Sequence, residues 1–286
     1  MNKIVISVES TCDLSAEVIK EYDMALINME YMVNNQTHIM GDGAYTMKQF
    51  YDKMREGASV KTTQVNEYSA TEHLESILEQ GNDVIHLAFS SSLSGTYNSF
   101  AQAAKTLKEK YPNRKIAVID SLCACAGQGI YAVIVAEYVK THSFEQTVGY
   151  AESLKQRILH YFVVDDLKYL AKGGRISKST ALLGNTLHMK PVMHMNREGK
   201  LVAYKKVISR KKSLMTVADM SISAYRNEFD RIFIAHADCK DDAKFVADRI
   251  FASLGITPEL FDLGMVIGSH SGPGTLAVFF TGEGRE

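Results

Sequence analysis

The sequence predicts an α/β protein in which a doubly wound parallel sheet is followed by a second, mixed α/β domain. In the first half of the chain, short apolar runs alternate with segments of helical periodicity, which is typical of a parallel sheet with crossover helices. Beyond a helix predicted over residues 144–158, longer helices separate the strands, which favours a mixed sheet. We therefore predict an N-terminal domain over residues 1–160 and a C-terminal domain over residues 161–286.

The N-terminal domain is predicted to alternate four strands with helices. Asp13 or Ser15 caps the first helix, and Thr46 opens the second with Gln49 in the capping-box position. The segment 60–65 is predicted to be a loop. The expected strands cover residues 4–8, 25–33, 84–89 and 116–119, and the helices with two predicted ends cover 13–22, 67–79, 96–108, 129–140 and 144–158.

The C-terminal domain is predicted to contain five strands, at residues 161–164, 192–195, 201–207, 231–236 and 276–280. Two long helices are expected over residues 211–229 and 241–254. Residues 197–200 form a hairpin turn in which Gly199 supplies a positive φ. The chain has only four prolines and no evident flexible linker, so we expect the two domains to pack closely and to leave a cleft between them.

Composition narrows the classes of partner. The formal net charge is −1, so the chain lacks the basic field of a nucleic-acid-binding protein, and no apolar run reaches the length of a membrane span. The first strand follows Met1 almost directly, without a signal peptide, which predicts a cytoplasmic location. The four cysteines lack zinc-ligand spacing and are expected to be reduced thiols.

The segment after the strand at residues 84–89 is the strongest candidate for a binding site. Ser90, Ser91, Ser92, Ser94 and Thr96 follow that strand and lead into a helix. Ligands of open α/β sheets lie beyond the carboxyl ends of strands, where the N-terminus of a helix favours an anion. Because no Lys or Arg occurs between residues 84 and 104, the segment suits a carboxylate better than a polyphosphate. The same residue types also form ordinary turns and helix caps.

Three further polar clusters combine hydrogen-bond donors with loop residues. They are Lys61-Thr62-Thr63-Gln64, Lys172-Gly173-Gly174-Arg175-Ile176-Ser177 and Gly268-Ser269-His270-Ser271-Gly272-Pro273-Gly274. Arg175 can hold an anion bidentately, although adjacent glycines also occur in simple turns. His270 lies among small residues, and we expect an exposed, mobile loop in which it acts as a donor or proton carrier.

In their order along the chain, these segments resemble the DegV family, the fatty-acid-binding subunits of bacterial fatty acid kinase. The resemblance spans essentially the whole sequence. Besides the serine segment and the three clusters above, it rests on Ser10-Thr11-Cys12-Asp13-Leu14, Val118-Ile119-Asp120-Ser121 and Lys190-Pro191.

The resemblance implies a two-domain DegV (EDD-type) fold with a ligand tunnel at the domain interface. The tunnel would hold a long-chain fatty acid as ligand, with no cofactor. Thr62 and Ser94 match the hydroxyls that bind the carboxylate, with Thr63 and Ser92 beside them. Arg175 and His270 would line the same head-group pocket.

The resemblance also implies a protein partner, the ATP-binding catalytic subunit of a fatty acid kinase. That subunit would convert the bound acid to an acyl phosphate for phospholipid synthesis. Arg210 matches a position implicated in docking the kinase, and Lys206, Lys211 and Lys212 surround it. The chain carries no phosphate-loop motif, and we expect it to bind no ATP and to perform no catalysis alone.

Two departures from the family pattern concern the candidate site. Glu9 stands where the family usually has Asp, and Val65 stands where it usually has Pro, which predicts a looser loop around Thr62.

Two other functions remain open at this point. One is a lipid carrier or sensor without a kinase. The other is a serine hydrolase with Ser94 as nucleophile and His270 as base, although the G-x-S-x-G elbow is absent.

Overall fold

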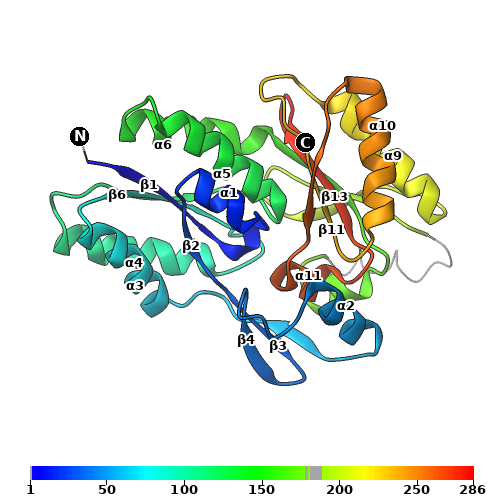
Figure 1. Cartoon of the computed structure of the whole chain (residues 1–286), viewed down its shortest axis with the longest axis horizontal. Helices are drawn as coiled ribbons and strands as arrows, with labels where there is room; N and C mark the ends of the chain where they lie inside the picture. The colour runs from blue at the N-terminus through cyan, green and yellow to red at the C-terminus, as the bar shows by residue number, and fades with distance from the viewer. Residues whose placement is uncertain (1, 178–179, 181–188) are drawn as a thin grey trace.

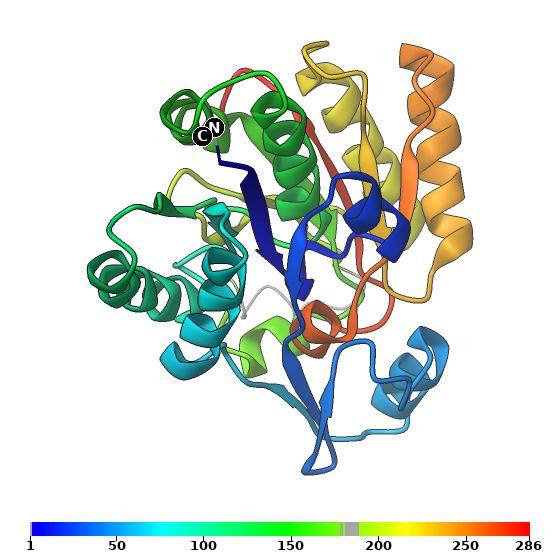
Figure 2. The ribbon, with the colours of Figure 1, turned by 60° about the vertical axis from the view of Figure 1, so that its left-hand side comes forward.

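The computed structural model describes residues 2–177, 180 and 189–286. It contains a parallel sheet built from the first half of the chain and a mixed sheet built from the second half, which lie side by side in Figure 1. A small antiparallel sheet projects from the N-terminal half (Figure 2). The predicted combination of a parallel and a mixed sheet is confirmed.

The parallel sheet has the order β2-β1-β6-β7. Every side chain of its central strand β6 is buried, because apolar residues face the helices on both sides. The strands are β1 (Ile4–Glu9), β2 (Ala25–Ile27), β6 (Asp83–Ala88) and β7 (Ile116–Asp120).

Helices cover both faces of the parallel sheet, as a doubly wound fold requires. Alternate residues of β1 and β6 point to opposite faces, so Val5 and Val84 pack with α3 and α4 while Ile6 and Ile85 pack with α5. The helices are α3 (Glu67–Glu79), α4 (Thr96–Lys110), α5 (Ala126–Val139) and α6 (Phe144–Leu154). Helix α5 is buried along most of its length because it also contacts β8, β11 and β13 of the second sheet (Figure 1).

The mixed sheet has the order β10-β9-β8-β13-β11-β12. Among the described strands of this sheet, β11 and β12 pair in parallel and the other neighbours are antiparallel. The strands are β8 (Ile158–Val163), β9 (Val192–Met195), β10 (Leu201–Lys205), β11 (Phe233–His236), β12 (Glu259–Asp262) and β13 (Leu276–Thr281). Helices α9 (Arg210–Ala224) and α10 (Lys240–Leu254) pack together and close a second apolar core against this sheet.

The remaining elements surround the junction of the two halves. The small sheet has the order β4-β3-β5, with β3 (Glu30–Val33), β4 (Gln36–Ile39) and β5 (Val60–Thr62). Helix α11 contacts β5, α2 and α7, which brings C-terminal residues against the N-terminal half. The helices are α1 (Ala16–Glu21), α2 (Met47–Arg55), α7 (Lys168–Lys172) and α11 (Met265–Ser271), with short 3₁₀ turns at Ser10–Cys12 and Lys155–Arg157.

Several predicted boundaries were wrong. The extended segment 25–33 divides into β2 and β3, which belong to different sheets, and the predicted loop 60–65 begins with strand β5. The helix predicted to reach residue 158 ends at Leu154, because Ile158 already pairs with Thr281 of β13. The helix predicted over 211–229 ends at Ala224. Strands β4 and β12 were not predicted.

Other local predictions agree with the structure. Ser15 rather than Asp13 caps α1, and Thr46 forms a complete capping box with Gln49. Strand β8 begins at Ile158 and belongs to the mixed sheet, so it crosses the proposed domain boundary at residue 160. The division into two domains at that residue stays a prediction. All four cysteines are free thiols. No helix in the described part of the chain is long and apolar enough to cross a membrane.

Candidate functional site

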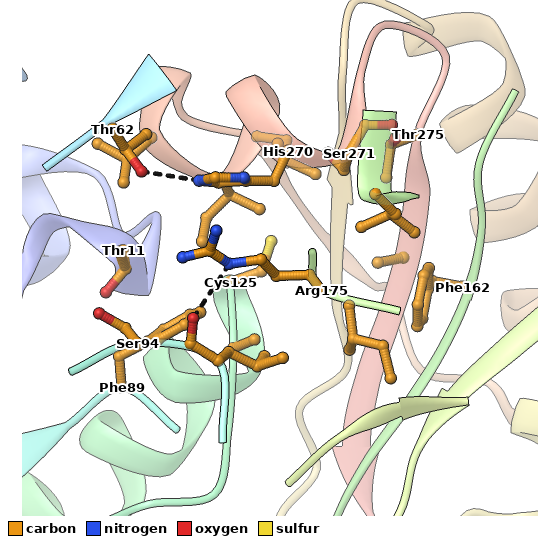
Figure 3. Close-up of a pocket in the computed structure, with 18 of the residues that line it drawn as sticks. Thr11, Thr62, Phe89, Ser94, Cys125, Phe162, Arg175, His270, Ser271 and Thr275 are labelled. Atoms are coloured by element: carbon orange, nitrogen blue, oxygen red, sulfur yellow. Dashed lines mark hydrogen bonds between the residues drawn. The ribbon is translucent and has the colours of Figure 1, made fainter. Parts of the chain in front are cut away.

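An apolar pocket of about 370 Å³ lies between the parallel sheet, the mixed sheet and helix α11 (Figure 3). Its volume falls within the range of small-molecule pockets, about 300 to 1,000 Å³. Most of its lining is aliphatic or aromatic, and both halves of the chain contribute. The apolar lining includes Met29, Phe89, Leu93, Phe162, Leu170, Met195, Leu201, Val266, Ile267, Ala277 and Phe279.

Polar side chains gather around Arg175 in the pocket lining. The guanidinium group lies between the ring of His270 and the side chain of Ser94 in Figure 3. Thr62, at the end of strand β5, lies 2.7 Å from His270, measured from Oγ1 to Nε2. The pocket is therefore amphipathic, with hydroxyls, an imidazole and a cation beside a largely apolar interior.

Arg175 carries a positive charge and has no counterion among the described residues. Its Nε donates a hydrogen bond to the carbonyl of Leu93 at 3.1 Å, and an Nη donates to the carbonyl of Gly173. Among the described residues no carboxylate pairs with it, and burial lowers the pKa of the guanidinium. A guanidinium has five N–H donors, so donors remain available beside the pocket. This arrangement favours an anionic ligand.

His270 lies in helix α11, not in the exposed, mobile loop that its glycine-rich neighbourhood predicts. It is half-buried, and burial together with the nearby Arg175 lowers the pKa of its imidazole to about 4. The ring is therefore neutral at pH 7, and one of its nitrogens accepts while the other donates. A side chain on Gly173 would place its Cβ 2.5 Å from Nδ1, so the glycine permits this close packing.

Ser94 lies where helix α4 begins and is joined to Thr96. Its Oγ accepts the N–H of Thr96 at 3.2 Å and lies 3.0 Å from Thr96 Oγ1. Thr96 Oγ1 in turn accepts the N–H of Val65 at 3.2 Å. When the Thr96 hydroxyl donates to Ser94, the Ser94 proton stays available for an oxygen in the pocket. The capping role that was an alternative for this segment thus coexists with a place in the pocket lining.

The backbone N–H of Val65 makes a hydrogen bond in the loop that the departure from proline is predicted to loosen. The hydrogen bond from the Val65 N–H to Thr96 joins the segment after Thr62 to the helix after Ser94. A proline has no N–H and could not make this bond. The substitution therefore replaces ring rigidity with a hydrogen bond between the two hydroxyl-bearing segments.

The structure brings together five of the six head-group candidates, Thr62, Thr63, Ser94, Arg175 and His270, all of which line the pocket. Ser92 is the exception. It is exposed and does not line the pocket, and its hydroxyl donates to the carbonyl of Glu198 at 2.5 Å. Ser92 therefore joins the serine segment to the hairpin between β9 and β10.

Glu9 does not line the pocket but makes hydrogen bonds to residues next to it. Its buried carboxylate accepts the N–H of Phe89, at 3.2 Å for Oε2, and the side-chain amide of Gln128 at 2.5 Å. Gln128 also accepts the hydroxyl of Thr11, which lines the pocket. The longer carboxylate at position 9 thus connects the ends of β1 and β6 to the first turns of α5.

Sequence reasoning missed several polar residues of the lining, among them Thr11, Cys125, His160 and Ser271. His160 has a structural role, because its Nε2 accepts the N–H of Ala124 at 3.2 Å and its Nδ1 lies 3.1 Å from the carbonyl of Ile158. The buried Ser271 hydroxyl has no partner among the described residues. Thr11 lies within the motif of residues 10–14, and Ser271 directly follows His270. Closeness in sequence to residues already singled out is the signal that could have identified both.

The residues predicted to dock a kinase lie outside the pocket lining, where β10 leads into α9. Lys206 and Lys211 are exposed, whereas Arg210 is half-buried and pairs with Asp242, with Nη2 2.8 Å from Oδ2. Ile208, with 68% of its surface exposed, lies within the same stretch of chain. Arg210 therefore carries less free charge than the sequence suggests, while the lysines remain accessible.

The geometry disfavours the serine-hydrolase alternative. The hydroxyl of Ser94 contacts Thr96 and that of Thr62 contacts His270, so the nucleophile and base of that hypothesis are not paired in the described structure. No carboxylate among the described residues orients the His270 ring. A nucleophilic serine needs both contacts.

The fold and the site together define an α/β protein that encloses an amphipathic ligand pocket between two sheets. The DegV family profile, described as "Uncharacterised protein, DegV family", matches residues 3–283. A DegV domain-containing protein of Clostridium perfringens is 39% identical over 290 residues, which cover 100% of both chains. This chain belongs to the DegV family.

Solved structures of the family have the same fold. A DegV family protein from Thermus thermophilus, described with its fatty acid binding, superposes with a TM-score of 0.86 at 25% identity, over 98% of this chain and 99% of that one. A fatty-acid-binding DegV family protein from Streptococcus agalactiae gives a TM-score of 0.84 at 28% identity, over 99% and 100% of the two chains. These relatives are similar to this protein over nearly its whole length.

Proposed function

We propose that this protein binds a long-chain fatty acid in the apolar pocket and presents its carboxylate to a separate kinase subunit. The kinase subunit would use ATP to convert the carboxylate to an acyl phosphate for phospholipid synthesis. The observation that carries the binding step is Arg175, a half-buried cation in the lining of an apolar pocket, for which the described residues supply no counterion. The solved relatives described as fatty-acid-binding proteins support the same ligand class.

The apolar lining supplies most of the affinity in this proposal. Each buried methylene contributes about 0.8 kcal/mol, so a dozen contribute on the order of 10 kcal/mol before the entropy of association is subtracted. The pocket lining is built from Met, Leu, Phe and Val side chains of both halves, which makes it suitable for an acyl chain. Retention of a lipid therefore needs little from the head group.

The polar side chains answer the cost of burying a carboxylate. An ionised carboxylate that leaves water requires several donors. Arg175 provides charge-assisted N–H donors, and Ser94 provides a hydroxyl proton when Thr96 donates to it. If His270 Nε2 carries the ring proton, it donates to Thr62 and leaves the Thr62 hydroxyl free to donate as well. Thr63 lies beside them in the lining.

The phosphoryl transfer itself is assigned to the partner. A carboxylate oxygen would form a bond to the γ-phosphorus of ATP while the bond from that phosphorus to the β,γ-bridging oxygen breaks, so that ADP leaves. This chain has no phosphate-loop motif, and we propose that the kinase subunit binds the nucleotide. Arg175 and the neutral His270 would stabilise charge near the carboxylate. We place the protein in the cytoplasm, where ATP and the kinase subunit would be available.

Native mass spectrometry of freshly purified protein, followed by lipid extraction, tests the binding step. We expect the mass of one fatty acid per chain. Protein that carries no lipid and also fails to bind added palmitate would refute the proposal. The same sample, incubated with ATP and palmitate but no partner, should form neither ADP nor acyl phosphate.

Reconstitution with the kinase subunit tests the presentation step against a plain lipid carrier. Lys211→Glu changes an exposed residue beside Arg210, and Lys105→Glu, an exposed lysine of helix α4, is the matched control away from α9 and α10. We expect Lys211→Glu to bind palmitate normally but to lower acyl phosphate formation at limiting kinase concentration, as Arg210→Glu also should. Equal rates for the variants at positions 210, 211 and 105 would argue against this docking surface. No acyl phosphate with any protein would favour the carrier.

A further inference from the structure

A second cavity of about 670 Å³ adjoins the apolar pocket. Thr62, Arg175 and His270 line both cavities, so these three side chains form a wall between them. The second cavity is bounded by the end of α2, strand β5 and helix α7, with α11 contributing His270. A ligand whose carboxylate reaches Arg175 therefore lies directly beside this second space.

The second cavity is strongly cationic. Its described lining contains no Asp or Glu but five basic residues, Arg55, Lys61, Lys168, Lys172 and Arg175. Arg55 pairs with Asp52 and Asp238, and Lys168 pairs with Asp166 at 2.8 Å. In the described structure no carboxylate pairs with the other three. The cavity thus has three uncompensated charges, two of them on exposed lysines.

We propose that this cavity is a binding site for a phosphate group, held by Lys61, Lys172 and Arg175 next to the carboxylate of a lipid bound in the first pocket. Three cations around one space suit a group with more than one negative charge, whereas a carboxylate is already served by Arg175 and the hydroxyls. The choice of phosphate among multiply charged anions rests on the proposed function, in which a phosphoryl group must reach that carboxylate.

The local backbone is compatible with an anion at this place. Helix α7 ends at Lys172, and the carbonyl groups at the end of a helix repel anions. Arg175 donates to the carbonyl of Gly173, which neutralises part of that repulsion. Lys61 belongs to β5, which pairs with β3, so its backbone is held in place although its side chain is exposed.

The test uses calorimetry to measure the binding of three ligands to the same set of variants. Inorganic phosphate probes the second cavity, palmitate probes the first pocket, and hexadecyl phosphate carries an alkyl chain and a phosphate together. The variant K61Q/K172Q removes two of the three free charges without touching Thr62, Arg175 or His270. The control K105Q/K108Q removes two exposed lysines of helix α4.

We expect K61Q/K172Q to weaken binding of inorganic phosphate and of hexadecyl phosphate by about tenfold or more, since each charge-assisted contact is lost. Palmitate affinity should change less than twofold, and K105Q/K108Q should resemble the unmodified protein for all three ligands. Competition of MgATP with inorganic phosphate would identify a nucleotide as the source of the phosphate. Absence of that competition, with tight hexadecyl phosphate binding, would identify the acylated product.

Two results would overturn the phosphate site. One is that K61Q/K172Q binds inorganic phosphate and hexadecyl phosphate with the same affinity as the unmodified protein. The other is that polyglutamate binds through Lys61 and Lys172 and is not displaced by phosphate, since the cations would then form a protein-docking surface. Failure of palmitate alone to bind would refute the proposed fatty-acid function, and the phosphate titration would still judge the second cavity.

Discussion

At the scale of single residues, Arg175 is the side chain on which the proposed carboxylate site depends. It is half-buried, it lines both cavities, and its hydrogen bonds within the described chain go to two backbone carbonyls. Neither carbonyl neutralises its charge. A fatty acid carboxylate would therefore provide the negative charge that these carbonyls lack.

We predict that Arg175→Gln weakens palmitate binding by about 10- to 100-fold, because the loss of a charge-assisted contact to a buried carboxylate costs about 1.5 to 3 kcal/mol. Arg249→Gln, a half-exposed arginine of α10 that pairs with Asp219 and lines neither cavity, is the matched control. Isothermal titration calorimetry compares the dissociation constants. Unchanged affinity in Arg175→Gln would place the carboxylate elsewhere.

Asp13 is a second residue with an unusual environment. Its buried Oδ1 accepts the N–H of Gly264, the residue before helix α11, at 3.1 Å, while its Oδ2 has no partner in the described structure. Burial raises the pKa of this carboxyl to about 7. Between its unfolded pKa of 3.8 and about 7, the folded protein thus binds more protons, and this group makes the free energy of unfolding fall as pH rises.

Asp13→Asn should remove that penalty, since asparagine tolerates the positive φ of 51° at this position and keeps an oxygen for Gly264. Urea denaturation at pH 5 and pH 8 measures the effect. We expect the stability of the variant relative to the unmodified protein to rise by about 2.5 kcal/mol between these pH values. Parallel changes in both proteins would show that Asp13 stays ionised throughout.

At the scale of elements, the site depends on the close packing of α7, β5 and α11. These three elements are distant in sequence, yet α11 contacts both of the others. Gly173 at the end of α7 leaves room for the His270 ring, which in turn contacts Thr62 of β5. The position of the imidazole is therefore set by backbone packing as much as by its hydrogen bond.

We predict that Gly173→Ala lowers palmitate affinity by about tenfold, because its Cβ would lie 2.5 Å from His270 Nδ1 and displace the ring. Gly149→Ala in α6 is the control, since a Cβ there meets no atom within 4 Å. Calorimetric titration with palmitate separates the two variants. Equal affinities would mean that His270 does not position the carboxylate ligands.

The sequence predicted long elements better than short ones. The periodicity of helix α3 and the apolar run of β6 identify those elements almost to the residue. Strands such as β4 and β12 are four residues long and pair with partners distant in the chain or through a tight hairpin, so local patterns do not reveal them. Helix α11 was missed because Gly264, Gly268 and Gly272 suggest a loop.

The same distinction applies to the site. The motifs around Thr62, Ser94, Arg175 and His270 were quoted from the sequence, and the pocket brings these four side chains together. The order of the motifs does not show which serine after strand β6 faces the pocket. Ser92 and Ser94 lie close together in the sequence, and the turn between them decides which one faces inward. The second cavity combines side chains from three distant segments, and only tertiary structure places them side by side.

At the scale of the whole molecule, helix α5 and the pocket both lie between the two sheets. Helix α5 contacts strands of both sheets, and the pocket lining includes Leu93 from one half and Phe162 from the other. A ligand in the pocket therefore contacts both halves at once. Its binding energy should stabilise their packing.

We predict that palmitate at 100 times its dissociation constant raises the free energy of unfolding by about 2.7 kcal/mol. Hydrogen exchange followed by mass spectrometry should show slower exchange in both β5 and β13 after palmitate addition, because residues of β5 and β13 line the pocket. Helix α10, which packs on the outer core, serves as the internal reference. Protection confined to one half would contradict a pocket shared by both.

The apolar lining of the first pocket has a consequence for selectivity. If the carboxylate is fixed at Arg175, the chain can extend only away from that point, and the pocket becomes a molecular ruler. Affinity should then rise about fourfold with each added methylene and stop rising at one length, where the next carbon meets the packed side chains. Discrimination among acyl chains would thus depend on the depth of the pocket, measured from the fixed carboxylate.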